Sequence, residues 1–305
     1  MVLTGGITHR VDHANGAARQ HALGIYQFAY NPLFKLRKAQ ALGGMGLLQE
    51  AMDCVVQLEK QEIDSPELYL TKASIHAQQR EHKLAIRYFK LALKHSDPAE
   101  HDYIYLDIAI EYERLAQYQE AIDTLQQALN ANKQNEAALY ELGRCYDALG
   151  ATEASIEAYL KFIDEQPYSS TAWYNLGNAY NKLNFFEKAI DAYDYAILIK
   201  ENFSSAYFNK GNSLVNLDRY SEAIDVYKQT FEYEPPNGDT YCAIGECYEK
   251  LEQMDEARKY YKKAVKMDPE QADAWFGIGV TLDFEERFFE SLHFYRKALE
   301  LDDQN

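Results

Sequence analysis

The chain contains little cysteine and little proline, and it has no long apolar run. Its four cysteines among 305 residues are too few to hold a fold together through disulfides, which fits a reducing compartment. No stretch of 18 or more apolar residues occurs, so the sequence predicts no insertion into a membrane. The first twenty residues also lack the charged start and apolar block of a secretory signal peptide. These absences together favour a cytoplasmic protein.

Positive charge is also in short supply. The chain carries 31 Lys and Arg residues against 48 Asp and Glu residues, a formal net charge of −17. The acidity is uneven, because residues 1–101 carry 12 basic and 10 acidic side chains, whereas residues 102–305 carry 19 and 38. Affinity for a phosphate backbone depends mainly on Lys and Arg, so we expect no nucleic-acid partner. Hydrophobic residues make up 47% of the chain, which is normal for a folded protein.

The few prolines follow a fixed spacing. Pro32 and Pro66 are 34 residues apart, as are Pro235 and Pro269, and Pro167 precedes Pro235 by 68. A constant spacing in this range indicates a repeat architecture. Proline breaks helix interiors, so its confinement to repeat boundaries leaves about 30 residues per repeat for helix. The sequence thus predicts a lead, residues 1–31, and a single array of eight repeats: 32–65, 66–101, 102–135, 136–169, 170–203, 204–237, 238–271 and 272–305.

Small residues occupy two fixed columns of these repeats. The eighth position is always alanine or glycine, and the twentieth is always alanine or serine. We expect the two helices of a repeat to approach closely where a small side chain of one meets a small side chain of the other. Tyrosine fills further columns and accounts for much of the total of 25. The eighth position holds Ala39, Ala73, Ala109, Gly143, Gly177, Gly211, Gly245 and Gly279.

The fifth repeat resembles the tetratricopeptide repeat (TPR), whose signature of Trp, Leu-Gly, Tyr and Ala appears as Trp173, Leu176, Gly177, Tyr180 and Ala189. The resemblance covers residues 32–305. The central stretch is similar to bacterial proteins built entirely of such repeats, of the kind found in Bacteroidetes. The resemblance implies an all-α fold, a right-handed α-solenoid superhelix of helix pairs A and B, with a concave groove lined mainly by A helices.

The two ends depart from the repeat. Residues 14–31 are expected to form a lone B helix, because Ala17 falls in the small-residue column. Residues 1–13 show no repeat pattern, so the start is either a frayed half-repeat or the remainder of a longer protein. The last repeat ends at Asn305 without the polar capping helix that solenoids normally need. We therefore expect exposed apolar surface there, covered by a partner or by further chain.

Patterns for catalysis and metal binding are nearly absent from the sequence. There is no Walker-type phosphate loop, no GxSxG elbow and no HExxH motif. His9 and His13 could share a helix face, but their segment has no helical pattern. The Glu290 and His293 pair lacks the additional carboxylates of a di-iron site. We therefore expect no enzyme activity, no cofactor and no metal.

The resemblance implies that the second, fifth, sixth, ninth, twelfth and thirteenth positions of a repeat face the groove. In repeats five and six the sixth and ninth positions are all asparagine, and two more asparagines lie nearby. Asparagine is a mediocre helix former, and we expect no packing contact here that would compensate for its low helix propensity. An amide both donates and accepts hydrogen bonds, as binding an extended peptide requires. The alternative is a solvated helix face that tolerates asparagine. The expected groove residues are Tyr140, Tyr174, Asn175, Asn178, Phe208, Asn209, Asn212, Glu246 and Phe276, with Cys242 in the same column as the aromatics.

The carboxylate clamp known in this family is incomplete here. Its two asparagine positions match Asn178 and Asn209, but its three basic positions hold Tyr174, Asp239 and Ala243. A ligand held by its C-terminal carboxylate is therefore disfavoured. Acidic residues around the groove favour a neutral or basic ligand, although a rim of solvating charges would look the same.

These features lead to one main hypothesis and three alternatives. The main hypothesis is a non-catalytic scaffold that binds a peptide or protein segment in its concave groove. The second is a structural module that self-associates as a homo-oligomer through uncapped terminal repeats. The third is a helical-repeat RNA binder, which would need a basic groove. The fourth is an accessory repeat domain of a larger protein.

Overall fold

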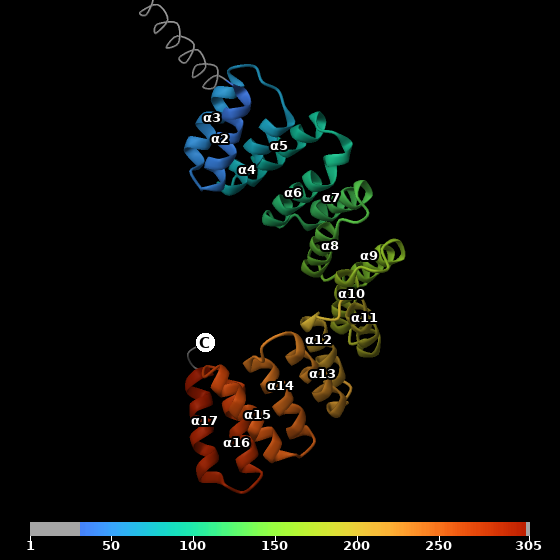
Figure 1. Ribbon diagram of the computed structural model, residues 1–305, viewed down its shortest axis with the longest axis vertical. Coiled ribbons are helices and arrows are strands. Elements are labelled where there is room, and N and C mark those ends of the chain that lie inside the picture. The colour runs from blue at the N-terminus through green and yellow to red at the C-terminus, as the bar shows by residue number, and fades with distance from the viewer. Residues whose placement is uncertain (1–30, 303–305) are drawn as a thin grey trace, which may run out of the picture. The chain divides into compact units, whose positions relative to one another are not determined.

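The computed structural model of the protein describes residues 31–302, and every regular element in this range is helical (Figure 1). The lone helix expected over residues 14–31, and His9 and His13, lie outside the described residues, apart from Asn31. By its internal contacts the chain divides between Cys145 and Tyr146 into an N-terminal and a C-terminal compact unit. No helix within residues 31–302 has both the length and the apolar character needed to span a bilayer.

The helices follow one another with short turns between them. The N-terminal unit contains α2 (Pro32–Gly44), α3 (Leu48–Glu59), α4 (Pro66–Gln78), α5 (His82–His95), the 3-10 helix η1 (Pro98–Glu100), α6 (His101–Arg114) and α7 (Tyr118–Ala131). Helix α8 (Glu136–Ala148) runs across the division. The C-terminal unit contains α9 (Thr152–Glu165), α10 (Ser170–Lys182), α11 (Phe186–Ile199), α12 (Ser204–Val215), α13 (Tyr220–Tyr233), α14 (Gly238–Lys250), α15 (Met254–Met267), α16 (Ala272–Asp283) and α17 (Phe288–Asp302).

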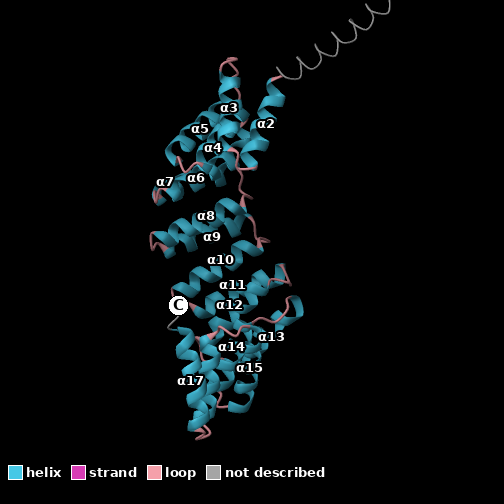
Figure 2. Ribbon diagram, turned by 90° about the vertical axis from the view of Figure 1, so that its left-hand side faces the viewer, coloured by secondary structure: helices cyan, strands magenta, loops and turns pink. Residues whose placement is uncertain are grey.

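Within each unit, neighbouring helices pack as antiparallel pairs, and each pair packs on the next (Figure 2). In the N-terminal unit the pairs are α2–α3, α4–α5 and α6–α7. In the C-terminal unit they are α10–α11, α12–α13, α14–α15 and α16–α17. Several first helices start at a side-chain cap, as where Ser65 accepts from the Leu68 N–H and Asn237 from the Thr240 N–H. The expected all-α fold of tandem helix pairs is confirmed.

The turn inside each pair has a repeated geometry. One residue in each turn has a positive φ, and the next residue donates its N–H to a carbonyl five residues back, as Gln117 does to Tyr112 at 2.9 Å. This is the Schellman ending of a helix, in which the left-handed position favours glycine. Glycine is used in only two of the eight turns, which comprise those of the seven pairs and the turn between α8 and α9. The left-handed residues are Gly46, Arg80, Ala116, Gly150, Asn184, Asp218, Glu252 and Glu286.

Four helical glycines of the eighth column lie against tyrosine rings, namely Gly177, Gly211, Gly245 and Gly279. A Cβ built on Gly177 would come within 2.5 Å of Tyr193 Cε1, and one on Gly211 within 2.4 Å of Tyr227 Cε1. Tyr193 and Tyr227 are almost completely buried. We expected the small residue to meet another small residue, and at these two glycines that expectation was wrong. Glycine is needed because an aromatic ring from the second helix fills the space where its side chain would be.

Candidate functional site

The asparagines of α10 and α12 have partners inside the fold. The Tyr193 hydroxyl donates to Asn178 Oδ1 at 2.8 Å, and the Tyr227 hydroxyl donates to Asn212 Oδ1 at 2.6 Å. In both cases the tyrosine comes from the second helix of the same pair. The expectation that these asparagines make no compensating contact in the fold was therefore wrong, because each accepts a hydrogen bond from a buried tyrosine hydroxyl.

A further hydrogen bond joins successive first helices. Asn209 Nδ2 on α12 donates to the Tyr174 hydroxyl at 3.1 Å and to Asn178 Oδ1 at 2.9 Å, both on α10. Both amide hydrogens of Asn209 are thereby used, while its Oδ1 accepts no hydrogen bond from the described part of the chain. The free acceptor belongs to a side chain that is only half-buried.

Beside this hydrogen-bonded cluster the C-terminal unit has a cleft of about 270 Å³, which we call the α12 groove. Three of the expected residues line it, namely Tyr174, Phe208 and Asn209. Its wall combines aromatic rings, hydroxyl groups and two carboxylates. The remaining lining residues are Ser204, Ser205, Thr230, Glu234, Pro235, Asn237, Asp239 and Thr240.

The other expected residues do not line the α12 groove. Asn175 is only 8% exposed, and its Nδ2 has no hydrogen-bond partner among residues 31–302, so it is not presented to a ligand. Glu246 is exposed, and its Oε1 lies 3.7 Å from the sulfur of the buried Cys242. Phe276 is exposed on α16. Tyr140 is exposed on α8, on the N-terminal side of the division.

The described residues show no metal-binding constellation, and their cysteines are not activated. No group of three or more His, Cys, Asp or Glu side chains within residues 31–302 is placed to hold a metal ion. Glu290 pairs with Arg287 at 2.7 Å, and the His293 ring contacts Phe294 instead. All four cysteines are free and buried. Burial raises the pKa of Cys145 and of Cys247 to about 12, so both remain neutral thiols at neutral pH.

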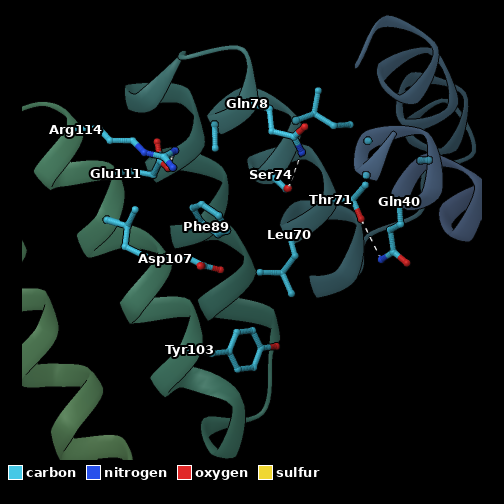
Figure 3. A pocket seen from close by; sticks show the side chains of 16 residues that line it. Gln40, Leu70, Thr71, Ser74, Gln78, Phe89, Tyr103, Asp107, Glu111 and Arg114 are labelled. Carbon is cyan, nitrogen blue, oxygen red and sulfur yellow. Dashed lines mark hydrogen bonds and ion pairs between the residues drawn. The ribbon is translucent and has the colours of Figure 1, made fainter. Parts of the chain in front are cut away.

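A larger cleft, of about 560 Å³, lies in the N-terminal unit between α2, α4 and α6 (Figure 3). We call it the α6 cleft. The groove positions of the TPR pattern, read over the first three repeats, include most of the residues that form it. Those positions hold Tyr103 (second), Leu70 (fifth), Thr71 and Asp107 (sixth), Gln40 and Ser74 (ninth), and Gln78 and Arg114 (thirteenth). Sequence reasoning missed this cleft because it followed the asparagines and aromatics of the later repeats.

Of the two carboxylates in the α6 cleft, Glu111 has ionic partners within the fold and Asp107 has none among the described residues. Glu111 is 3% exposed; its carboxylate lies 2.7 Å from His82 Nδ1 and accepts from Arg114 Nη1 at 2.6 Å. Asp107, one helical turn earlier on α6, has no hydrogen bond or ion pair with any described residue. Burial, and after it the Glu111 charge, raises the pKa of Asp107 to about 6.

Family comparisons agree with this architecture. Tetratricopeptide repeat models match residues 66–94, 106–170, 170–203, 204–237, 238–271 and 272–305. The chain therefore belongs to the tetratricopeptide repeat family. Such repeats form scaffolds typical of protein–protein interaction. A search of curated proteins found no match.

Several solved structures share the fold. The C-terminal part of a TPR protein from Cytophaga hutchinsonii, a member of the Bacteroidetes, superposes with a TM-score of 0.65 at 18% identity, covering 80% of this chain and 99% of that one. A MamA protein gives a TM-score of 0.50 at 31% identity, covering 57% and 94%. YrrB, described as a TPR protein with an unusual peptide-binding site, gives 0.50 at 21% identity, covering 58% and 91%. The expected similarity to bacterial TPR proteins is confirmed.

Proposed function

We propose that the protein is a non-catalytic cytoplasmic scaffold that binds an extended peptide or protein segment in the α12 groove. The observation that carries this proposal is the convergence of Tyr174, Phe208 and Asn209 on one cleft. The two rings offer rigid apolar contact, and Asn209 Oδ1 is available to accept a backbone N–H. The same fold carries a peptide-binding site in YrrB.

The chemistry of the groove favours a neutral or basic ligand. Glu234 and Asp239 line it, and no Lys, Arg or His is among its lining residues. An acidic ligand, including nucleic acid, would meet like charge there without a basic partner. Asn209 Oδ1 and the hydroxyl of the exposed Ser205 supply polar contacts without a carboxylate clamp.

A substitution at the mouth of the groove tests the proposal without disturbing the core. Ser205 is exposed and lines the groove, so Ser205→Arg should fill it and lower the affinity at least about tenfold. Ser221→Arg, at an exposed position of α13 outside the groove, is the matched control and should bind as wild type does. Peptides selected on the wild type from a displayed random library would be titrated calorimetrically against all three proteins. Equal affinity for wild type and Ser205→Arg would refute the proposal.

Self-association is the second candidate, favoured by the apolar face of α17. Phe289 is 98% exposed on this helix, and Phe288, Leu292 and Leu299 are also exposed. Exposed apolar area of this kind is often an interaction site. We expect the mass measured by analytical ultracentrifugation to rise with protein concentration, and Phe289→Glu to reduce that rise. A monomeric mass at every concentration would exclude this second function.

A further inference from the structure

The α6 cleft contains one carboxylate, Asp107, that has no hydrogen-bond or ion-pair partner among the residues that the structure describes. Figure 3 shows Asp107 pointing from α6 toward Leu70 on α4, with no ion pair drawn to it. The charge of Arg114 acts to lower the pKa of Asp107, but that guanidinium donates its hydrogen bond to Glu111. A half-buried ionised carboxylate without a partner is unfavourable. A cation arriving from outside would remove this penalty.

The walls around Asp107 are of a kind that fits a long cationic side chain. Leu70, Phe89 and Ile110 give the cleft an apolar surface, along which a lysine or arginine stem can lie. The Tyr103 and Ser74 side chains add hydroxyl oxygens that can accept from an ammonium or guanidinium group. At about 560 Å³ the cleft is also in the size range, about 300–1,000 Å³, of cavities that hold ligands.

We propose that the α6 cleft is a second binding site, distinct from the α12 groove, and that it takes a lysine or arginine side chain of an extended partner segment, with Asp107 as the counter-ion. The alkyl stem lies between α4 and α6, and the charged head reaches the Asp107 carboxylate. Charge complementarity selects this occupant, because Glu111 is satisfied internally and Asp107 is not.

Defined peptide pools test this assignment. Four pools of fluorescein-labelled octapeptides share randomised uncharged residues and differ only at one central position, which is Lys, Arg, Gln or Glu. By fluorescence anisotropy, wild type should bind the Lys or the Arg pool at least about tenfold more tightly than the Gln pool, as expected for a charge-assisted hydrogen bond in a partly buried site. In Asp107→Asn the preference should shrink to less than about twofold. Absence of the preference in wild type, or its survival in Asp107→Asn, would overturn the proposal.

Three further variants remove ambiguity. Asp123→Asn, which neutralises an exposed carboxylate of α7, should keep the preference. Ser74→Lys, at an exposed lining position, should abolish it by supplying an internal cation, and this variant stands in if Asp107→Asn fails to fold. Ser205→Arg blocks the α12 groove and should leave the preference intact. A preference lost in Ser205→Arg but kept in Asp107→Asn would assign it to the α12 groove and refute the inference, independently of the proposed function.

Discussion

Tyr193 and Asn178 lie 15 residues apart, on the two helices of one pair, and the phenol donates to the amide oxygen over 2.8 Å. Tyr227 and Asn212 repeat the contact in the next pair. Burial raises the pKa of both phenols, so each remains a hydrogen-bond donor at physiological pH. In the following pair an acidic residue takes over the acceptor role, since Tyr261 donates to Glu249 at 2.7 Å. The tyrosine–asparagine contact thus belongs to the scaffold as well as to the groove beside it.

Removing these hydroxyls should lower stability. Tyr227→Phe leaves Asn212 Oδ1 without its tyrosine donor and should cost about 1 kcal/mol of unfolding free energy. Tyr193→Phe should cost less, because Asn178 Oδ1 still accepts from Asn209. The unfolding free energies are compared by urea unfolding followed by circular dichroism. Tyr168→Phe is the control, because the Tyr168 side chain is 85% exposed. Equal midpoints for Tyr227→Phe and Tyr168→Phe would show that the buried bond adds nothing.

Alanine in place of glycine should have opposite effects at two helical positions. Gly211→Ala would place a Cβ 2.4 Å from the buried Tyr227 ring, and the resulting displacement should cost about 1–3 kcal/mol. In Gly43→Ala the nearest atom, Ile75 Cγ1, would be 3.9 Å away, so the variant should instead gain up to about 1 kcal/mol of helix propensity. Guanidinium unfolding midpoints measure both. A stable Gly211→Ala would mean that the ring can move aside.

The turns inside the helix pairs offer a reciprocal pair of substitutions. Ala116 has φ 55°, in the left-handed region, so Ala116→Gly should raise stability by about 1 kcal/mol. Gly150 has φ 68°, and a Cβ added to it would meet nothing within 4 Å, so Gly150→Ala should lose a similar amount, about 1 kcal/mol, from the backbone alone. Thermal unfolding of the two variants is the measurement. Shifts of the same sign would contradict this account.

The Asp107 carboxyl should make stability depend on pH. Its folded pKa of about 6 lies above its ordinary value of 3.8, so the folded protein binds more protons between these pH values than the unfolded chain does. The free energy of unfolding therefore falls as pH rises through this window and stays lower above it. Asp107→Asn, which cannot ionise, should be more stable than wild type by about 1–3 kcal/mol near pH 7.5 and nearly equal near pH 4.

Urea unfolding at both pH values measures this difference, with Asp123→Asn as the exposed-carboxylate control. A gain that is the same at both pH values would show that ionisation of Asp107 is not its cause. A gain confined to high pH would show that the ionised Asp107 stabilises the folded state less than a neutral asparagine does at the same position. That is the behaviour expected of a residue kept for binding rather than for stability.

The position of the α6 cleft was readable from the repeat, although its chemistry was not. Asp107 and Thr71 occupy the sixth position of their repeats, the same position as Asn175 and Asn209. Yet Asn175 is buried, Asn209 is bonded to α10, and Asp107 has no partner among the described residues. A shared position in the repeat specifies the face of the helix on which a side chain lies. The partner of that side chain depends on which residue of the neighbouring helix lies opposite it.

Proline spacing and the columns of small residues were enough to predict the helix pairs. A proline ring, or the lack of a large side chain, affects the helix at its own position in the sequence. The sequence also showed that the acidic charge lies after residue 101. It did not show that glycines of the eighth column face tyrosine rings, that Asn178 serves Tyr193, or that Asp107 lacks a counter-ion within the described residues. These relationships depended on the tertiary structure, since they join residues on different helices through packing that no local pattern encodes.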